Sequence, residues 1–279
     1  QETIMKYFKE KIASDNPLAQ DATLECYLID MSEKIRWKAR PAVILCPGGA
    51  YYFTNDRESE PVALSFLAKG FHAFSLRYST EKAIYPTALS ELAKTVKMVR
   101  AHAEEWNVDP NRIILVGFSA GGHLASEFAA KWHENDLLQL VNAQAEEIRP
   151  NALVLGYPVI TLGKYTHVPS AENLLGENRT EEAVLNASVE KNVTDHFPPT
   201  FLWHTETDPT VPVQNSLLLA ASLAEQKVPF ELHIFPYGSH GLGLANNCTV
   251  EEDRHVNDYC DVWFEEAVKF LRHYLEIEK

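Results

Sequence analysis

Residues 113–122 read IILVGFSAGG, an apolar run that ends in a serine between closely spaced glycines. The run is typical of a buried strand, and the residues after it are typical of a helix. A serine on such a turn, in the pattern G-x-S-x-G, indicates a nucleophile elbow. The turn is so tight that positions 117 and 121 nearly touch, which requires glycine at both. The sequence therefore predicts Ser119 as a nucleophile lifted off the end of a strand. The alternative is a glycine-rich turn with a capping serine, which does not explain the partner residues below.

Apolar runs alternate with longer helical patterns on both sides of this turn. Five runs are typical of strands buried on both faces: Ala42–Cys46, Phe71–Leu76, Ile113–Val116, Ala152–Leu155 and Thr200–Trp203. Leu24–Ile29 and Glu231–Phe235 resemble alternating or edge strands. Helical patterns follow Pro86 and cover 120–132, 213–226 and 261–275. The alternation predicts the α/β class, with a doubly wound, mostly parallel sheet and helices on both faces.

One region departs from the alternation. Residues 163–199 are polar and rich in Asn, Glu and Thr, and we expect one or two short helices there. The pattern predicts one α/β domain over residues 1–279 with an insertion at 163–199, which is a candidate cap or lid.

Composition excludes several classes of protein. The 279 residues hold 25 Lys+Arg and 39 Asp+Glu, a net charge of −14, which argues against nucleic acid as a partner. No apolar run approaches the ~20 residues of a membrane span, and Gln1 to Asp15 lack the apolar core of a signal peptide. We therefore expect a cytoplasmic protein without a membrane partner, and we leave a homo-oligomer open.

The four cysteines point to neither a disulfide framework nor a metal site. Cys26, Cys46, Cys248 and Cys260 form no CxxC pair and no zinc-type cluster with histidine. We expect reduced, buried thiols, no metal and no cofactor.

The loop after the strand Ala42–Cys46 is the candidate oxyanion hole. It reads Pro-Gly-Gly-Ala-Tyr at residues 47–51, and it leaves the sheet at the same edge as Ser119. We expect the backbone N–H groups of Gly49, Ala50 and Ala120 to face the developing negative charge, and one such donor contributes about 3 kcal/mol to lowering the barrier.

The base and its orienting acid are expected after two later strands. His240 lies in a glycine-flanked loop after Glu231–Phe235, and Asp208 follows Thr200–Trp203, with Glu206 as the nearest rival. The imidazole would accept the serine proton, and the carboxylate would fix its tautomer. The order Ser119, Asp208, His240 along the chain is that of the α/β-hydrolases.

With these residues in place, the chain resembles the α/β-hydrolase superfamily, and within it the hormone-sensitive-lipase-like and acetyl xylan esterase-like carboxylesterases. The resemblance spans about Ala42 to Leu275, and four segments carry it: CPGGAYYFTNDRESEPVA, GFSAGGHLAS, PPTFLWHTETDPTVPVQNS and FELHIFPYGSHGLGLA. It implies metal-independent hydrolysis of short acyl esters. One departure is that Pro47 and Ala50 stand where many relatives have the first His and last Gly of His-Gly-Gly-Gly.

The leading hypothesis is a serine carboxylesterase that acts on short-chain, acetyl-type esters of sugars or xylan-derived oligosaccharides. Tyr51, Tyr52 and Trp203 are candidates to line the pocket or pack under sugar rings, with core packing as the alternative. An amide or formamide hydrolase or a peptidase with the same triad is the second hypothesis, and a binding protein without catalysis is the third.

Overall fold

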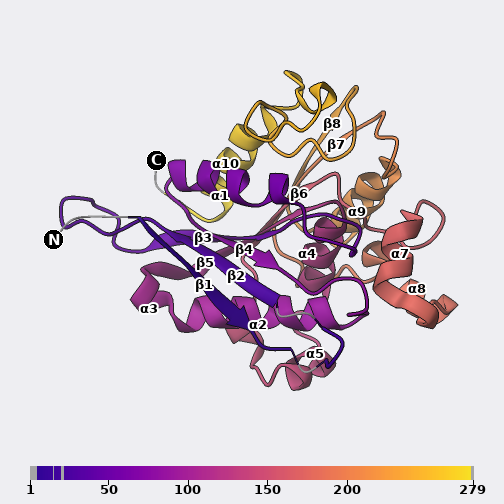
Figure 1. Ribbon diagram of the computed structural model, residues 1–279, viewed down its shortest axis with the longest axis horizontal. Coiled ribbons are helices and arrows are strands. Elements are labelled where there is room, and N and C mark those ends of the chain that lie inside the picture. Colours follow the sequence, from indigo (N-terminus) through magenta and orange to yellow (C-terminus); the bar gives the residue numbers. More distant parts are fainter. Residues whose placement is uncertain (1–4, 15, 20–21, 278–279) are drawn as a thin grey trace.

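Eight strands form a single sheet in the order β1-β2-β4-β3-β5-β6-β7-β8 (Figure 1). The computed structural model describes residues 5–14, 16–19 and 22–277. β1 and β2 run antiparallel to their neighbours, and all the other pairs are parallel. The strands are β1 Lys6–Ile12, β2 Ala22–Leu28, β3 Arg40–Cys46, β4 His72–Arg77, β5 Val108–Phe118, β6 Ala152–Gly156, β7 Thr200–Thr205 and β8 Phe230–Phe235. The predicted α/β fold, with its mostly parallel sheet, is confirmed.

Helices cover both faces of this sheet, and α1 and α10 lie on the face opposite α2 (Figure 1). The α-helices are α1 Glu60–Ala68, α2 Thr87–Ala101, α3 Ala103–Trp106, α4 Ser119–Lys131, α5 Asn135–Leu140, α6 Ala145–Ile148, α7 Val168–Leu175, α8 Glu181–Ala187, α9 Gln214–Glu225 and α10 Trp263–Tyr274. The described residues also form four 3-10 helices: η1 Asp56–Glu58, η2 Gly176–Asn178, η3 Val189–Lys191 and η4 Asp253–His255.

The central strands are largely apolar on both faces because each contributes side chains to two cores. In β3, Ile44 belongs to the core beneath α2 and α4, whereas Val43 and Leu45 belong to the core beneath α1 and α10. All seven residues of β3 are buried. Successive side chains of a strand point to opposite faces, so a strand covered on both sides has no polar face.

The strand order reverses next to β3, which fixes where a ligand can bind. The chain passes from β3 through α1 to β4 on one side, and then through α2 to β5 on the other side. Ligand sites of open α/β sheets lie outside the carboxyl ends of strands at such a reversal. The loop after Cys46 and the turn at Ser119 both leave the sheet there.

Several elements were absent from the sequence prediction, among them β1, α1 and the short helices α5 and α6. β1 is an edge strand that carries three lysines, Lys6, Lys9 and Lys11, and much of it is exposed. Its sequence therefore contains no apolar run from which a strand could be predicted. Helix α1 buries Val62, Ala63 and Phe66 but exposes Leu64, so its apolar residues follow no single helical stripe.

Two predicted strands differ in detail. Because β1 pairs with β2, the strand predicted at Leu24–Ile29 lies inside the sheet rather than at its edge. β5 begins at the buried Val108, five residues before Ile113, and includes the partly exposed stretch Asp-Pro-Asn-Arg at 109–112, where the register with β3 shifts.

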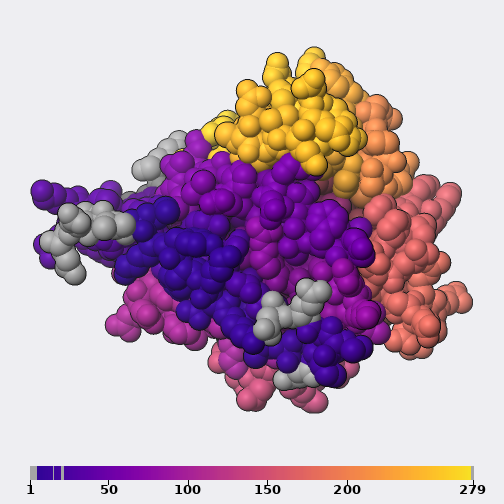
Figure 2. Space-filling view, in the orientation of Figure 1, coloured from indigo at the N-terminus to yellow at the C-terminus, as the bar shows by residue number. Residues whose placement is uncertain are grey.

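Residues 163–199 connect β6 to β7 and contain α7, η2, α8 and η3. Figure 2 shows their atoms in salmon along one side of the molecule. All four cysteines are free; three are buried as predicted, but Cys248 is exposed. Within the described residues, no helix combines the length and the apolar character that crossing a membrane would require.

Candidate active site

Ser119 lies on a sharp turn between β5 and α4, at the position that the sequence predicts. Its φ is +52°, a left-handed conformation that a serine adopts only when the surrounding structure imposes it. A Cβ atom on Gly117 would lie 2.5 Å from the carbonyl oxygen of Gly121, and a Cβ atom on Gly121 would collide with the carbonyl oxygen of Cys46. Both glycines are therefore required by close backbone approach.

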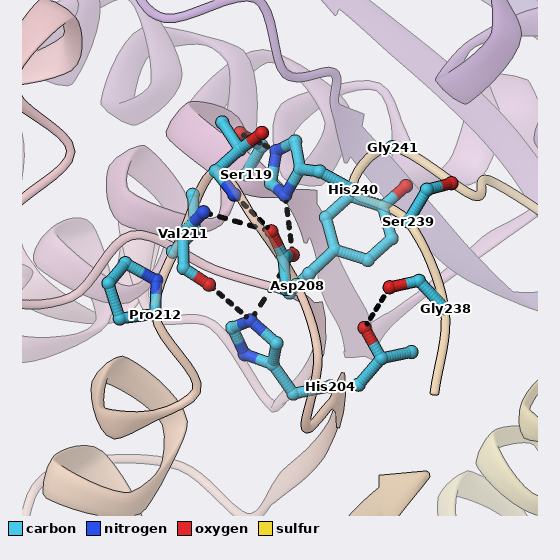
Figure 3. A network of polar contacts seen from close by, with 12 residues as sticks. Ser119, His204, Asp208, Val211, Pro212, Gly238, Ser239, His240 and Gly241 are labelled. Atoms are coloured by element: carbon cyan, nitrogen blue, oxygen red, sulfur yellow. Dashed lines mark hydrogen bonds and ion pairs between the residues drawn. The ribbon is translucent and has the colours of Figure 1, made fainter. Parts of the chain in front are cut away.

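Ser119, His240 and Asp208 form a continuous hydrogen-bonded line (Figure 3). The Ser119 Oγ lies 2.8 Å from His240 Nε2, and His240 Nδ1 lies 2.7 Å from Asp208 Oδ2. A carboxylate only accepts, so Nδ1 carries the hydrogen and Nε2 is free to accept the hydroxyl proton. The three side chains come from the ends of β5, β7 and β8, so the structure brings together residues that are up to 121 positions apart.

Asp208 is held as a buried anion. Its Oδ1 accepts the backbone N–H groups of Thr210 and Val211, at 2.8 and 2.9 Å. Burial by itself raises the pKa of Asp208, but hydrogen bonds from His204 and His240 outweigh it and hold the pKa well below that of an ordinary aspartate. The side chain of Asp208 is therefore charged throughout the neutral range. The rival Glu206 is exposed and makes none of these contacts.

His204 is a member of this network that sequence reasoning missed. Its Nε2 donates to the carbonyl oxygen of Val211 at 3.0 Å and lies 3.4 Å from Asp208 Oδ2 (Figure 3). Its Nδ1 accepts from the hydroxyl of Ser216 at 2.8 Å. His204 is fully buried in β7, and its Nε2 approaches the same carboxylate oxygen, Oδ2, that His240 contacts. Its position four residues before the aspartate is the signal that the sequence offered.

The loop after β3 presents unpaired amide groups next to Ser119. Gly49, Ala50 and Tyr51 all have positive φ, at 131°, 54° and 59°. Among the hydrogen bonds of the described residues, none uses the N–H group of Gly49 or Ala50. Ala120 stands in the first turn of α4, where an N–H group has no acceptor within the helix. These three residues are the predicted oxyanion donors, and the first two line the same cavity as Ser119.

A buried carboxylate ties this loop to the loop that carries His240. Glu58, only 1% exposed, accepts the N–H of Gly48 and the hydroxyl of Tyr157, each at 2.7 Å. The Tyr157 oxygen accepts in turn from the N–H of Gly243 at 2.8 Å. Burial and the adjacent Glu58 carboxylate raise the pKa of Tyr157 well above its usual value, so the phenol keeps its proton and donates. The Tyr157 ring also packs edge-on against His240, with ring centroids 5.0 Å apart.

Arg57 makes a second connection between the same two loops. Its Nη1 donates to the carbonyl oxygen of Gly241 at 2.7 Å, and its Nε forms an ion pair with Glu251 at 3.1 Å. Tyr157 lies 99 positions from Glu58, and Gly241 lies 184 positions from Arg57, so neither contact has a local signal in the sequence.

A cavity of about 280 Å³ opens over Ser119 and His240. Most of the residues that line it carry polar side chains, and Phe53, Ala50 and the glycines add apolar and backbone surface: Gly49, Ala50, Phe53, Asn55, Arg57, Glu58, Ser119, His167, Thr210, His240, Gly241, Glu251, Arg254 and His255. No group of three or more His, Cys, Asp or Glu side chains within the described part of the chain is arranged to hold a metal ion.

The three aromatic residues predicted to contact substrate do not line this cavity. Tyr51 is buried, and its hydroxyl donates to Nδ1 of the equally buried His123 at 2.8 Å. Tyr52 is 59% exposed and lies outside the lining. Trp203 is fully buried and stacks on Trp263 at a centroid distance of 5.2 Å. Trp203 takes the alternative role of core packing, because residue 203 lies within β7, where side chains enter the core.

His123 is a buried structural residue that hydrogen-bonds through both ring nitrogens. Its Nε2 donates to the carbonyl oxygen of Ala187 at 2.7 Å, which leaves Nδ1 to accept from Tyr51. The imidazole thus connects helix α4 to the oxyanion loop and to residues 163–199.

A doubly wound sheet with a serine, a histidine and an aspartate aligned at its carboxyl edge defines the α/β-hydrolase class. Comparison with known proteins agrees: the family model BD-FAE matches residues 29–223. The chain belongs to the BD-FAE family.

Relatives of the chain include enzymes of known name. The Endo-1,4-beta-xylanase B of Butyrivibrio fibrisolvens is 36% identical over 87% of this chain and 39% of that protein. The acetylxylan esterase of Xylanibacter ruminicola is 28% identical over 73% of this chain and 41% of that protein. The crystal structure of an acetyl ester-xyloside bifunctional hydrolase from Caldicellulosiruptor lactoaceticus matches with a TM-score of 0.80 and 38% identity, over 93% of this chain and 92% of the other. The chain spans about two fifths of the length of the two curated relatives.

Proposed function

We propose that this protein is a serine carboxylesterase that hydrolyses short acyl esters, above all acetyl esters of xylan-derived sugars. The observation that carries the proposal is the 2.8 Å contact from the Ser119 hydroxyl to an imidazole whose other nitrogen donates to a buried aspartate. The relatives named for acetylxylan and acetyl ester hydrolysis support the substrate class. They favour an ester over the amide or formamide bond of the second hypothesis.

The first half of the reaction forms an acyl-enzyme. Ser119 Oγ attacks the ester carbonyl carbon while His240 Nε2 takes its proton, and the carbonyl oxygen becomes an anion. The N–H groups of Gly49, Ala50 and Ala120 stabilise that anion, and each donor contributes about 3 kcal/mol. Asp208 stabilises the imidazolium without taking its proton. The alcohol then leaves with the proton from His240.

The second half of the reaction releases the acid. Water attacks the acyl carbon while His240 accepts one of its protons, and the same N–H groups stabilise the second oxyanion. Collapse of this intermediate breaks the bond to Ser119 Oγ, which recovers its proton from His240. One ester and one water give one alcohol and one acid, with no other reactant.

Residues 163–199 act, in this proposal, as a cap on a single hydrolase domain. Support comes from Asn173 in α7, whose side-chain amide donates to the carbonyl oxygen of Ala50 at 2.8 Å. His167 of the same segment lines the cavity. A cytoplasmic location remains a prediction, as does any homo-oligomer.

The test is the substitution Ser119→Ala, assayed with p-nitrophenyl acetate and with acetylated xylo-oligosaccharides. The loss of the nucleophile lowers kcat by at least about 10⁴-fold on both substrates, while the circular dichroism spectrum stays that of the wild type. Activity retained in this variant would exclude the proposal.

A further inference from the structure

His167 brings an imidazole into the cavity from outside the triad. It is the N-cap residue of α7 and is half-buried. Of residues 163–199, all of which the structure describes, it alone lines the cavity over Ser119 and His240. Nothing in the mechanism above uses it.

The position of His167 is fixed by packing and by hydrogen bonds from α7. The helix buries Ser170, Ala171, Leu174 and Leu175. The carbonyl oxygen of Leu174 accepts from the N–H of Tyr85 at 2.8 Å, and Asn173 donates to Ala50. Because α7 is fixed by these contacts, the imidazole of His167 has a defined position next to the oxyanion loop.

The hydrogen bonds of His167 determine which of its nitrogens faces substrate. Nδ1 lies 2.8 Å from the hydroxyl of Ser170, which is fully buried. The hydrogen bonds of the described residues include no other acceptor for that hydroxyl, so it donates to Nδ1. The ring hydrogen therefore stands on Nε2. Nε2 makes no hydrogen bond within the described residues, and it is not buried. It is therefore open to the cavity.

The ring is uncharged at neutral pH. Burial lowers the pKa of His167, the nearby His240 lowers it further, and Asp208 opposes the shift. A neutral N–H donor suits an uncharged oxygen acceptor such as a hydroxyl or an ether oxygen.

The chemistry of the ester decides which part of the substrate this donor meets. An acetyl group has one polar atom, the carbonyl oxygen, and the backbone N–H groups take that atom. A further donor can therefore bind only to the alcohol part. We infer that His167 donates a hydrogen bond from Nε2 to a hydroxyl or ring oxygen of the alcohol and so selects polyhydroxylated alcohols; this inference rests on the proposed function.

The test compares two substrates that share an acetyl group. An acetylated xylose offers several oxygens beside the ester, whereas p-nitrophenyl acetate offers none at those positions. His167→Leu removes the donor at similar size, and His167→Gln retains an N–H donor. His273→Leu, at an exposed position of α10, is the matched control.

We expect His167→Leu to lower kcat/KM on the acetylated xylose about 5- to 10-fold more than on p-nitrophenyl acetate, the value of one neutral hydrogen bond. The loss should appear mainly in KM, because the contact exists before and during the reaction. His167→Gln should recover much of it, and His273→Leu should not change the ratio between the substrates.

Equal losses on both substrates, an unchanged ratio or no recovery in His167→Gln would overturn the inference. A wild-type protein that hydrolyses the aryl ester but not the sugar ester would also overturn it and leave the esterase proposal standing. A wild-type protein inactive on both esters would contradict the proposed function itself.

Discussion

At the scale of single residues, the site depends on how Asp208 is held. Its carboxylate accepts two backbone N–H groups and the imidazole of His240 while fully buried. Substitution Asp208→Asn removes the charge that fixes the tautomer and stabilises the imidazolium. We expect kcat to fall about 10³- to 10⁴-fold, measured on p-nitrophenyl acetate at pH 7. A loss below tenfold would contradict the role of Asp208.

The lowered pKa of Asp208 also makes a contribution to stability that depends on pH. Because the folded pKa lies below the unfolded value of about 3.9, the contribution is complete above pH 4 and is lost as the pH falls through the folded pKa. Wild type should exceed Asp208→Asn in free energy of unfolding by on the order of 2 kcal/mol at pH 7, and the difference should shrink below pH 4. Urea denaturation between pH 7 and pH 3 measures this. A difference that grows on acidification would show that the sign is wrong.

Residue-level prediction succeeded where the signal was local. The glycines around it identify Ser119, and their positions just after strands identify His240 and Asp208. The structure places these three residues in one hydrogen-bonded line. For Tyr51 and Trp203 the sequence left core packing open as the alternative, and the structure shows both buried, because burial depends on which face of the sheet or loop a side chain takes. His204, Glu58 and Tyr157 acquire their significance only from distant contacts.

At the scale of elements, η1 joins the two loops on which the site depends. Glu58 connects Gly48 to Tyr157 and Gly243, and Arg57 holds Gly241. The oxyanion donors directly follow Gly48, and His240 directly precedes Gly241. These contacts therefore hold the oxyanion loop and the catalytic imidazole in place relative to each other. We regard Glu58 as a positioning residue.

Substitution Glu58→Gln tests this positioning role. It leaves the size unchanged but disturbs the hydrogen bonds to Gly48 and Tyr157, so we expect a loss of about 1–3 kcal/mol in stability and at least a tenfold fall in kcat with little change in KM. Tyr157→Phe should act in the same direction, and Glu105→Gln, at an exposed position of α3, is the control. A purely structural role would lower the melting temperature and leave kcat of the folded protein unchanged.

Most elements could be predicted because strands buried on both faces have a distinctive composition. β1 and α1 could not, since an exposed edge strand and a helix without a single apolar stripe lack that pattern. The alternation of strands and helices predicts a doubly wound sheet, but it does not give the strand order, which the structure supplies.

At the scale of the whole molecule, the cavity sets the size of the acyl group. Its volume of about 280 Å³ leaves little room for a long acyl chain, and most of its lining residues carry polar side chains. Added methylene groups should meet polar or occupied space, which costs about 1–3 kcal/mol. In a series of p-nitrophenyl esters, kcat/KM should be highest for acetate or propionate and fall at least tenfold by octanoate. A preference for chains longer than about eight carbons would contradict the cavity as described.

The central claim is that Ser119 is a nucleophile activated by His240, and covalent labelling tests it most directly. The protein is incubated with a fluorophosphonate probe, and the adduct is located by mass spectrometry of the intact chain and of its peptides. The account predicts a single adduct on Ser119 that forms far more slowly in His240→Ala. A folded protein that stays unlabelled, or one labelled at another residue, would contradict it.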